Sequence, residues 1–265
     1  MRLPEFCDYH LPALSTDEVR HNLIISILTR ANAEQSQDLL IWSLGEPGCC
    51  AAKSPGRGIV LGELGQAQCR KLAEDVSELD FPAVLGPDRS ATRFVERATE
   101  LGLLFQDPIP QKIHALSEAP LYPGAPGHAR PVIAEDAVVF ADWMTAFHGE
   151  AAPHDPLPRR SDLEKKAGKD RHLFWIVDGN PVSLAGITRQ TQQIAAIGPV
   201  YTPPHLRGRG YAGSVTAAIV ERIYAEGKTT ACLYTDLRNP YSNRCYAKVG
   251  FRPACNSYFY PRVTS

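Results

Sequence analysis

A strand, a bend and a helix follow one another between residues 197 and 226, and this stretch constrains the chain more than any other. Residues 197–211 read IGPVYTPPHLRGRGY, so a short apolar strand enters a proline-rich bend and then a basic turn with two glycines. The first turn of a helix leaves four backbone N–H groups unpaired and carries a partial positive charge. Gly208 and Gly210 leave that backbone uncluttered. The stretch therefore predicts a phosphate-binding turn.

Strand and helix patterns alternate through both halves of the chain. Ser15 and Glu18 form a capping-box pattern that predicts the start of the first helix. The first half further predicts strands at 38–44, 58–64 and 81–85 and helices at 65–79 and 89–101. The second half predicts helices at 136–148, 211–226 and 239–249 and strands at 172–177, 181–189, 193–201, 229–235 and 251–260. This order predicts an α/β fold of the α+β type, with a mixed, mostly antiparallel sheet flanked by helices in two tandem lobes.

Proline and glycine mark two breaks in this pattern. Residues 116–131 are rich in both and predict a linker or an extended crossing strand, which places the first lobe at residues 1–125 and the second at 126–265. Gly198 and Pro199 interrupt the strand that enters the phosphate-binding turn. Because proline has no N–H to donate to a central ladder, we expect a bulge or a splay of the strands there.

The amino-acid composition limits the classes of partner that this chain is expected to bind. The 265 residues carry a net charge of −1, and 44% of them are hydrophobic. A near-neutral chain lacks the basic excess typical of nucleic-acid binding, so we expect small-molecule or protein partners and no nucleic acid. A homodimer is left open as one form of protein partner. No apolar run approaches the roughly 20 residues of a membrane helix, and the N-terminus lacks a signal-peptide pattern, which predicts a cytoplasmic location. The seven cysteines form no metal-ligand spacing, so we expect reduced thiols and no metal; Cys49 and Cys50 are expected at a hairpin tip.

Two motifs in the second half resemble the GNAT superfamily of acyl-CoA N-acyltransferases. One is the R-x-x-G-x-A pattern at Arg207, Gly210 and Ala212, and the other is NPYSNRCYAKVGF at residues 239–251. Their order and their spacing of about thirty residues are specific in combination, and the resemblance covers residues 129–263. It implies the acyl-CoA N-acyltransferase fold, with acetyl-CoA as co-substrate.

The resemblance also implies roles for residues of the two motifs. Coenzyme A would be bound by Val200, Tyr201, Arg207, Gly208, Arg209, Gly210, Tyr211, Ala212, Asn239 and Asn243. Tyr246 would be the general acid that protonates the departing thiolate, since a phenol with a reference pKa near 10 stays protonated yet acidic enough to donate. The alternative for Tyr246 is a core tyrosine packed beside Val249 and Phe251.

The general base is less clear, because the strand QQIAAIG carries no carboxylate. Glu150 is the first candidate, with His154 and Asp155 as rivals and a solvated loop residue as the alternative. Asp236 and Arg238 are expected to brace the loop that presents Asn239. In the first half, residues 85–89 stand where a phosphate-binding turn would fall but lack the second glycine, which is similar to a degenerate GNAT-like lobe.

These expectations combine into one function and two alternatives. We expect an N-acetyltransferase that moves an acetyl group from acetyl-CoA to a primary amine of a small molecule or amino-acid-like acceptor by direct attack. A non-catalytic acyl-CoA-binding or sensing module is the first alternative, favoured by the missing strand carboxylate. An aminoacyl-tRNA-dependent transferase is the second, and the near-neutral charge argues against it.

Overall fold

The computed structural model describes residues 1–122, 124–151 and 157–263. The chain forms two compact units. Unit 1 contains Met1–Ile113, Asp236–Arg238 and Ala254–Ser265, and unit 2 contains His114–Thr235 and Asn239–Pro253. Each unit is a mixed, mostly antiparallel sheet flanked by helices, which confirms the predicted fold class. The division into tandem lobes at residues 125 and 126 stays a prediction.

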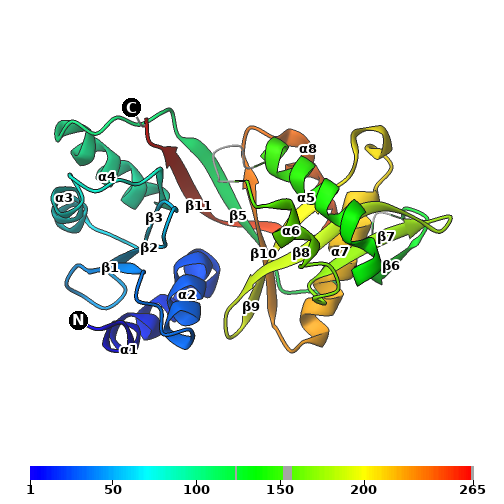
Figure 1. The fold of residues 1–265 in the computed structure, drawn as a ribbon, viewed down its shortest axis with the longest axis horizontal. Coiled ribbons are helices and arrows are strands. Elements are labelled where there is room, and N and C mark those ends of the chain that lie inside the picture. The colour runs from blue at the N-terminus through cyan, green and yellow to red at the C-terminus, as the bar shows by residue number, and fades with distance from the viewer. Residues whose placement is uncertain (123, 152–156, 264–265) are drawn as a thin grey trace. The chain divides into compact units, whose positions relative to one another are not determined.

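Unit 1 combines four helices with a sheet whose strand order is β1-β2-β3-β4-β11 (Figure 1). Only the β3–β4 pair is parallel; the other three pairs are antiparallel. The elements are α1 (Leu3–Leu14), α2 (Glu18–Ala33), β1 (Leu40–Ser43), β2 (Cys50–Lys53), β3 (Ile59–Leu61), α3 (Gln66–Asp75), β4 (Ala83–Pro87), α4 (Asp88–Glu100) and β11 (Arg252–Pro261).

The start of α2 differs from the prediction. Asp17, not Ser15, caps the helix, and its carboxylate accepts a hydrogen bond from the Arg20 N–H at 3.0 Å. A short 3₁₀ turn at Ser15–Asp17 connects α1 to α2, and the sequence pattern did not reveal α1. Cys50 was also predicted at a hairpin tip. It is instead the first residue of β2, buried and paired with Ser43 of β1.

Unit 2 has the strand order β5-β10-β9-β8-β7-β6, and β9 with β10 is a parallel pair. The pairs from β6 to β9 are antiparallel. The elements are β5 (Ile109–Leu116), which begins in unit 1, β6 (His128–Pro131), α5 (Ala137–Ala151), α6 (Arg160–Glu164), β7 (His172–Val177), β8 (Asn180–Gln190), β9 (Ile194–Tyr201), α7 (Tyr211–Ala225), β10 (Thr230–Asp236) and α8 (Pro240–Val249).

The two units repeat one order of elements. Two antiparallel hairpin strands lead into a strand–helix–strand crossover, which is β3–α3–β4 in unit 1 and β9–α7–β10 in unit 2, and a further helix and strand follow. The last strand of the first repeat, β5, begins in unit 1 and ends in unit 2, where it neighbours β10. The last strand of the second repeat, β11, pairs with β4 of unit 1. The predicted duplication is therefore present.

Alternating side chains of β7 decide which helix covers which face of the unit 2 sheet. Leu173 and Trp175 belong to the cluster that α7 completes, whereas Phe174 and Ile176 belong to the cluster that includes Phe140 of α5. This period of two is what a strand dictates when both of its faces are covered. Helices α7 and α5 thus lie on opposite faces (Figure 1).

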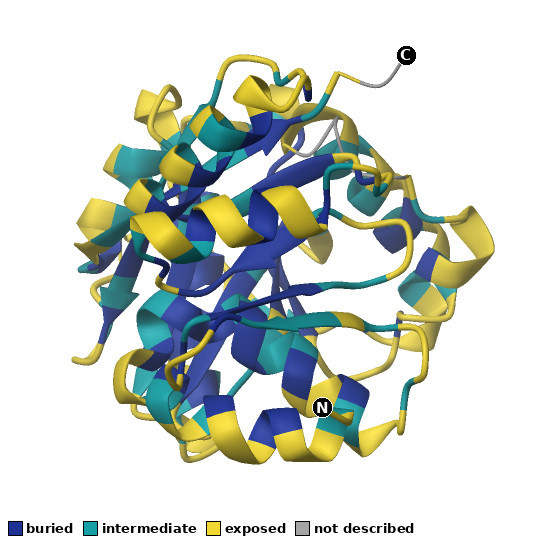
Figure 2. Cartoon of the chain, turned by 90° about the vertical axis from the view of Figure 1, so that its left-hand side faces the viewer, coloured by how far each residue is buried: buried dark blue, intermediate teal, exposed yellow. Residues whose placement is uncertain are grey.

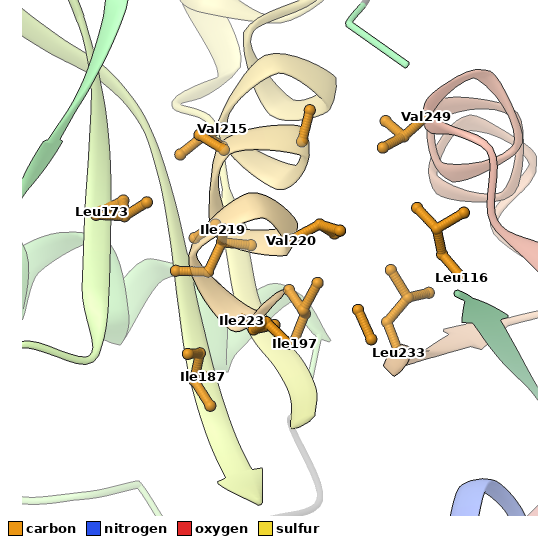
Figure 3. Packing of buried hydrophobic residues seen from close by; sticks show 14 of the residues in the cluster. Leu116, Leu173, Ile187, Ile197, Val215, Ile219, Val220, Ile223, Leu233 and Val249 are labelled. Atoms are coloured by element: carbon orange, nitrogen blue, oxygen red, sulfur yellow. The ribbon is translucent and has the colours of Figure 1, made fainter. Parts of the chain in front are cut away.

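Helix α7 is buried along most of its length because it is covered on more than one side. Val215, Ile219 and Ile223, spaced four residues apart, project toward the strands that carry Leu173 and Ile187 (Figure 3). Leu116, Leu233 and Val249 close the cluster beyond the helix. In unit 1 the helices carry exposed positions on their outer sides, whereas β2, β3 and β4 are mainly buried (Figure 2). Among the described helices, none is both long and apolar enough to span a membrane.

A buried histidine in each unit predicts a loss of stability in acid. His172 is 8% exposed, and burial, reinforced by Lys166, Arg171 and Arg222, lowers its pKa to about 4. Burial likewise lowers the pKa of His21 in unit 1 to about 4. The unfolded chain binds these protons from about pH 6.5 downward while the folded chain does not, so stability falls between pH 6.5 and 4. Each histidine contributes at most about 3 kcal/mol to this loss.

Denaturant unfolding at pH 7 and pH 5 measures this effect. The single variants His172→Gln and His21→Gln should each reduce the difference in unfolding free energy between the two pH values, because a neutral amide takes up no proton. A difference as large as that of the parent protein in both variants would contradict the assignment.

Candidate functional site

The parallel ladder between β9 and β10 opens partway along both strands. Pairing runs from Ile194 with Thr230 to Ile197 with Leu233 and then stops, although β9 continues to Tyr201 and β10 to Asp236. The β8–β9 register also shifts there, and the Gly198–Pro199 peptide bond is cis. The predicted splay is confirmed. Beyond Ile197 the ladder between the described residues of β9 and β10 does not continue, so an extended ligand could pair with this edge of β9.

The turn that follows β9 is open at its glycines. A 3₁₀ turn at Pro204–Leu206 leads into Gly208 and Gly210, whose φ angles are 82° and 83°, in the left-handed region that favours glycine. Both glycines are exposed, and a Cβ built on Gly208 would meet no atom within 4 Å. Gly210 caps α7, and the Ser214 N–H donates to the Gly210 carbonyl at 3.1 Å. The N–H groups before Ser214 are those that a helix leaves unpaired.

The Arg207 side chain makes its contacts with the end of β9 and with α5. Its Nε donates to the Thr202 carbonyl at 2.9 Å, and one terminal nitrogen donates to both carboxylate oxygens of Glu150, at 2.9 and 2.6 Å. The guanidinium also lies 5.9 Å from the ring centroid of Tyr201. The Arg207 N–H donates to the Pro204 carbonyl at 3.3 Å. Side chain and backbone N–H of this predicted coenzyme ligand are therefore both engaged within unit 2.

Arg209 contrasts with Arg207. It is exposed between the two glycines, and within residues 1–122, 124–151 and 157–263 no acidic side chain forms an ion pair with it. A cation at the N-terminal end of a helix adds to the positive end of the helix dipole. In the described part of the chain, the turn thus combines exposed glycines with an arginine that has no ion-pair partner, an arrangement that suits an anionic ligand.

Buried hydroxyls hold the end of β9. The Ser183 hydroxyl donates to the Tyr201 carbonyl at 3.1 Å and lies 2.8 Å from the Thr202 hydroxyl. Because the single proton of Ser183 goes to a carbonyl, the Thr202 hydroxyl must donate to Ser183. Trp143 of α5 packs beside Tyr201, with ring centroids 6.0 Å apart. Sequence patterns gave no signal for Ser183, Thr202 or Trp143, since isolated hydroxyls and aromatics on regular elements read as ordinary packing.

The asparagines of the second motif shape the start of α8. Asn239 caps the helix, and its side-chain oxygen accepts from the N–H groups of Tyr241 and Ser242, both at 3.2 Å. The Asn243 amide donates to the Asn239 carbonyl at 2.8 Å. A coenzyme contact by either asparagine stays a prediction, and the cap alone accounts for Asn239 at this position.

Tyr246 lies on α8, partly buried against the cluster that contains α7. Its ring packs edge-on against Phe251, with centroids 6.2 Å apart. Burial, with a smaller effect of Cys245, raises the pKa of Tyr246 above its ordinary value. The phenol is therefore protonated at neutral pH, as a proton donor must be, and the core-packing contact predicted as the alternative is present as well.

Among the other predicted residues, Asp236 and Arg238 brace their loop. The Arg238 guanidinium and N–H both bind the Asp236 carboxylate, at 2.7 and 2.8 Å. Glu150 lies in the last turn of α5 with 48% of its side chain exposed, against Arg207. His154 and Asp155, the rival candidates for the base, lie outside the described residues.

In unit 1, the link from β3 to α3, at residues 62–65, corresponds by element order to the phosphate-binding turn of unit 2. The predicted counterpart at residues 85–89 is therefore wrong, because those residues join β4 to α4. In the link, the Leu64 N–H donates to the Ser90 hydroxyl at 2.8 Å, and Glu63 places a carboxylate in the turn. A Cβ on Gly62 would meet the Gly48 carbonyl oxygen at 2.6 Å. The β3–α3 link of unit 1 therefore has neither the uncrowded glycine backbone nor the arginines of the turn before α7.

Among the described residues, no cluster of three or more histidine, cysteine or acidic side chains could hold a metal ion.

Comparisons with known proteins agree with this geometry. Residues 175–260 match the family model of the FR47-like protein. A search of curated proteins finds no match. Similar solved structures include a GCN5-related N-acetyltransferase from Kribbella flavida, with a TM-score of 0.59 and 16% identity over 91% of this chain and 96% of that one. A putative GNAT-family acetyltransferase from Novosphingobium aromaticivorans has a TM-score of 0.54 and 18% identity over 92% and 100%.

A tandem GNAT protein from the clavulanic acid biosynthesis pathway is also similar, with a TM-score of 0.52 and 13% identity over 86% of this chain and 85% of that one. At these identities the likeness concerns the fold, including the duplication in the last case. The resemblance predicted from the two motifs is confirmed: this chain has the GNAT acyltransferase fold, and its residues 175–260 match the FR47-like family model.

Proposed function

We propose that the chain is an N-acetyltransferase that moves an acetyl group from acetyl-CoA to a primary amine of a small molecule or amino-acid-like acceptor. The observation that carries this proposal is the end of the β9–β10 pairing at Ile197 and Leu233, followed by a turn whose exposed glycines, Gly208 and Gly210, lead into α7. An extended pantetheine arm and a pyrophosphate have the shapes that suit these two features.

The chemistry is a direct displacement at the thioester carbonyl. The amine nitrogen forms a bond to the carbonyl carbon, the carbon–sulfur bond breaks, and the acetyl group ends on nitrogen. Backbone N–H groups near Val200 and Tyr201 are placed where β9 has left β10, so they could stabilise the developing oxyanion. Tyr246 supplies the proton that the departing thiolate takes up, and burial, which raises the pKa of Tyr246, keeps the phenol protonated until the thiolate forms.

The amine must also lose a proton before or during attack. Residues 194–201 of β9 bring no carboxylate, so Glu150 stays the proposed base. Both oxygens of Glu150 contact Arg207, and accepting a proton would cost that ion pair. A pH–rate profile of Glu150→Gln tests the role: loss of the acidic limb assigns the base to Glu150, and a retained limb assigns proton uptake to another group.

Calorimetric titration with acetyl-CoA should show one binding site per chain. Unit 2 offers an open turn with Arg209, whereas the corresponding junction of unit 1 is tied to Ser90 and carries Glu63. Release of free thiol with a panel of primary amines then tests turnover.

A titration without heat or saturation would refute the proposed function. Two sites per chain would refute the assignment of unit 1 as coenzyme-free. Binding without thiol release for any amine, unchanged in Tyr246→Phe, would favour an acyl-CoA-binding or sensing module, for which the missing carboxylate on β9 is the supporting observation.

A further inference from the structure

Beyond Ile197, β9 has lost one of its two neighbouring strands. Its last residues are held by β8, where Ala185 pairs with Val200 and Leu184 pairs with Tyr201. A strand with one neighbour has half the ladder hydrogen bonds of a central strand, so its position depends more on side-chain contacts. The position of this segment matters because it would carry the backbone groups that meet the acyl donor.

The Arg207 guanidinium joins this segment to α5. One nitrogen binds the carbonyl of Thr202, the first residue after β9, and another binds the Glu150 carboxylate in the last turn of α5. The face of Tyr201 lies beneath the same group at 5.9 Å. A guanidinium has fixed, planar donors, so three simultaneous contacts restrict the relative positions of the groups it joins.

The contacts of Arg207 with Thr202 and Glu150 occupy donors that a phosphate would otherwise use. A phosphate could bind the Arg207 side chain only by displacing the Glu150 carboxylate or by using donors that remain. Arg209 lies two residues on, exposed, with no ion-pair partner in the described part of the chain. Two arginines of one short turn therefore have different surroundings, although the sequence suggests the same role for both.

We propose that the Arg207 side chain is a positioning residue that fixes the unpaired end of β9 to α5 through Glu150, while Arg209 is the arginine that binds coenzyme phosphate. The proposal deepens the proposed function and rests on it for the role of Arg209. The link between Arg207 and Glu150 stands on its own contacts. Glu150, besides being the proposed base, sets the position of β9 while it is ionised, and its conversion to glutamine weakens the same link.

Hydrogen exchange of the amides that pair the Val200–Tyr201 end of β9 with β8 tests the link directly in the absence of ligand, because these amides are protected only while that end of β9 stays in place. A half-exposed ion pair stabilises by up to about 1 kcal/mol, so Arg207→Met and Glu150→Gln should each accelerate exchange about 2- to 5-fold. The double variant should exchange no faster than Arg207→Met alone, because both changes remove one contact. Arg209→Met is the matched control and should leave these amides unchanged.

Coenzyme A titration and steady-state kinetics then separate the two arginines. Arg209→Met should raise the Kd for coenzyme A about tenfold, the loss expected for one charge-assisted contact. Arg207→Met should change that Kd less than about twofold while raising KM for the acceptor or lowering kcat. Arg207→Lys, which keeps the charge next to Glu150, should recover part of this loss.

Equal losses of coenzyme affinity in Arg207→Met and Arg209→Met would overturn the proposal. So would exchange that accelerates in Arg207→Met but not in Glu150→Gln, since the link would then not involve α5. A parent protein that fails to bind coenzyme A refutes the proposed function and the role of Arg209, but the exchange measurement still decides whether Arg207 and Glu150 hold β9.

Discussion

Replacing Gly210 by glutamate should abolish coenzyme A binding. The new carboxylate would stand at the cap of α7, beside the N–H groups that are proposed to receive the pyrophosphate. Like charges brought together at a binding site cost several kcal/mol, so we expect the Kd to rise by about 100-fold or more. Calorimetric titration of the variant with coenzyme A measures the loss.

Gly210→Ala is the control, because glutamate changes the backbone as well as the charge. The φ angle of Gly210 is 83°, and any L-residue there pays about 1–2 kcal/mol. The alanine variant carries the same strain without the carboxylate. It should therefore lose the same thermal stability as Gly210→Glu but keep most of its coenzyme affinity. Micromolar binding by Gly210→Glu would rule out the turn as the phosphate site.

Replacing Tyr246 by phenylalanine should lower kcat by about 100-fold or more, the usual contribution of a positioned proton donor. Phenylalanine keeps the edge-on ring contact with Phe251 and the packing against the core cluster. The melting temperature and the Kd for coenzyme A should therefore stay close to those of the parent protein. Stopped-flow detection of free thiol measures the rate.

The pH dependence gives an independent check on Tyr246. Because burial disfavours the phenolate, the pKa of Tyr246 lies above its ordinary value near 10, and the donor keeps its proton as the pH rises through 9. No loss of kcat through deprotonation of Tyr246 is expected below pH 10. Unchanged kcat in Tyr246→Phe would place Tyr246 among the packing residues and leave thiolate protonation to solvent.

Local patterns revealed much of the fold. Period-two and period-3.6 hydrophobic spacing located most strands and helices of unit 2, including β9, α7 and β10. Gly198-Pro199 predicted the splay because proline lacks a ladder donor, and the register of β9 with β10 confirms it. Where the patterns were weak they failed: β2 is four residues long, and α1 contains a proline at position 12.

Contacts between distant residues decided the rest. The Arg207–Glu150 ion pair joins positions 57 residues apart, and the hydroxyl network of Ser183 and Thr202 joins two strands. Pairing of β11 with β4 places the C-terminal strand in unit 1, and no local pattern specifies which sheet a terminal strand completes. The order of the elements also shows that the unit 1 counterpart of the phosphate-binding turn is the link at residues 62–65, not residues 85–89 as predicted.

By itself, the sequence determined the strand–turn–helix from Ile197 to Tyr211, because proline, glycine and apolar periodicity act on neighbouring residues. Only the tertiary structure decided what the charged side chains of that turn do. An arginine side chain is long and finds its partner across the fold, so Arg207 and Arg209 look alike in the chain and differ once α5 brings Glu150 to one of them.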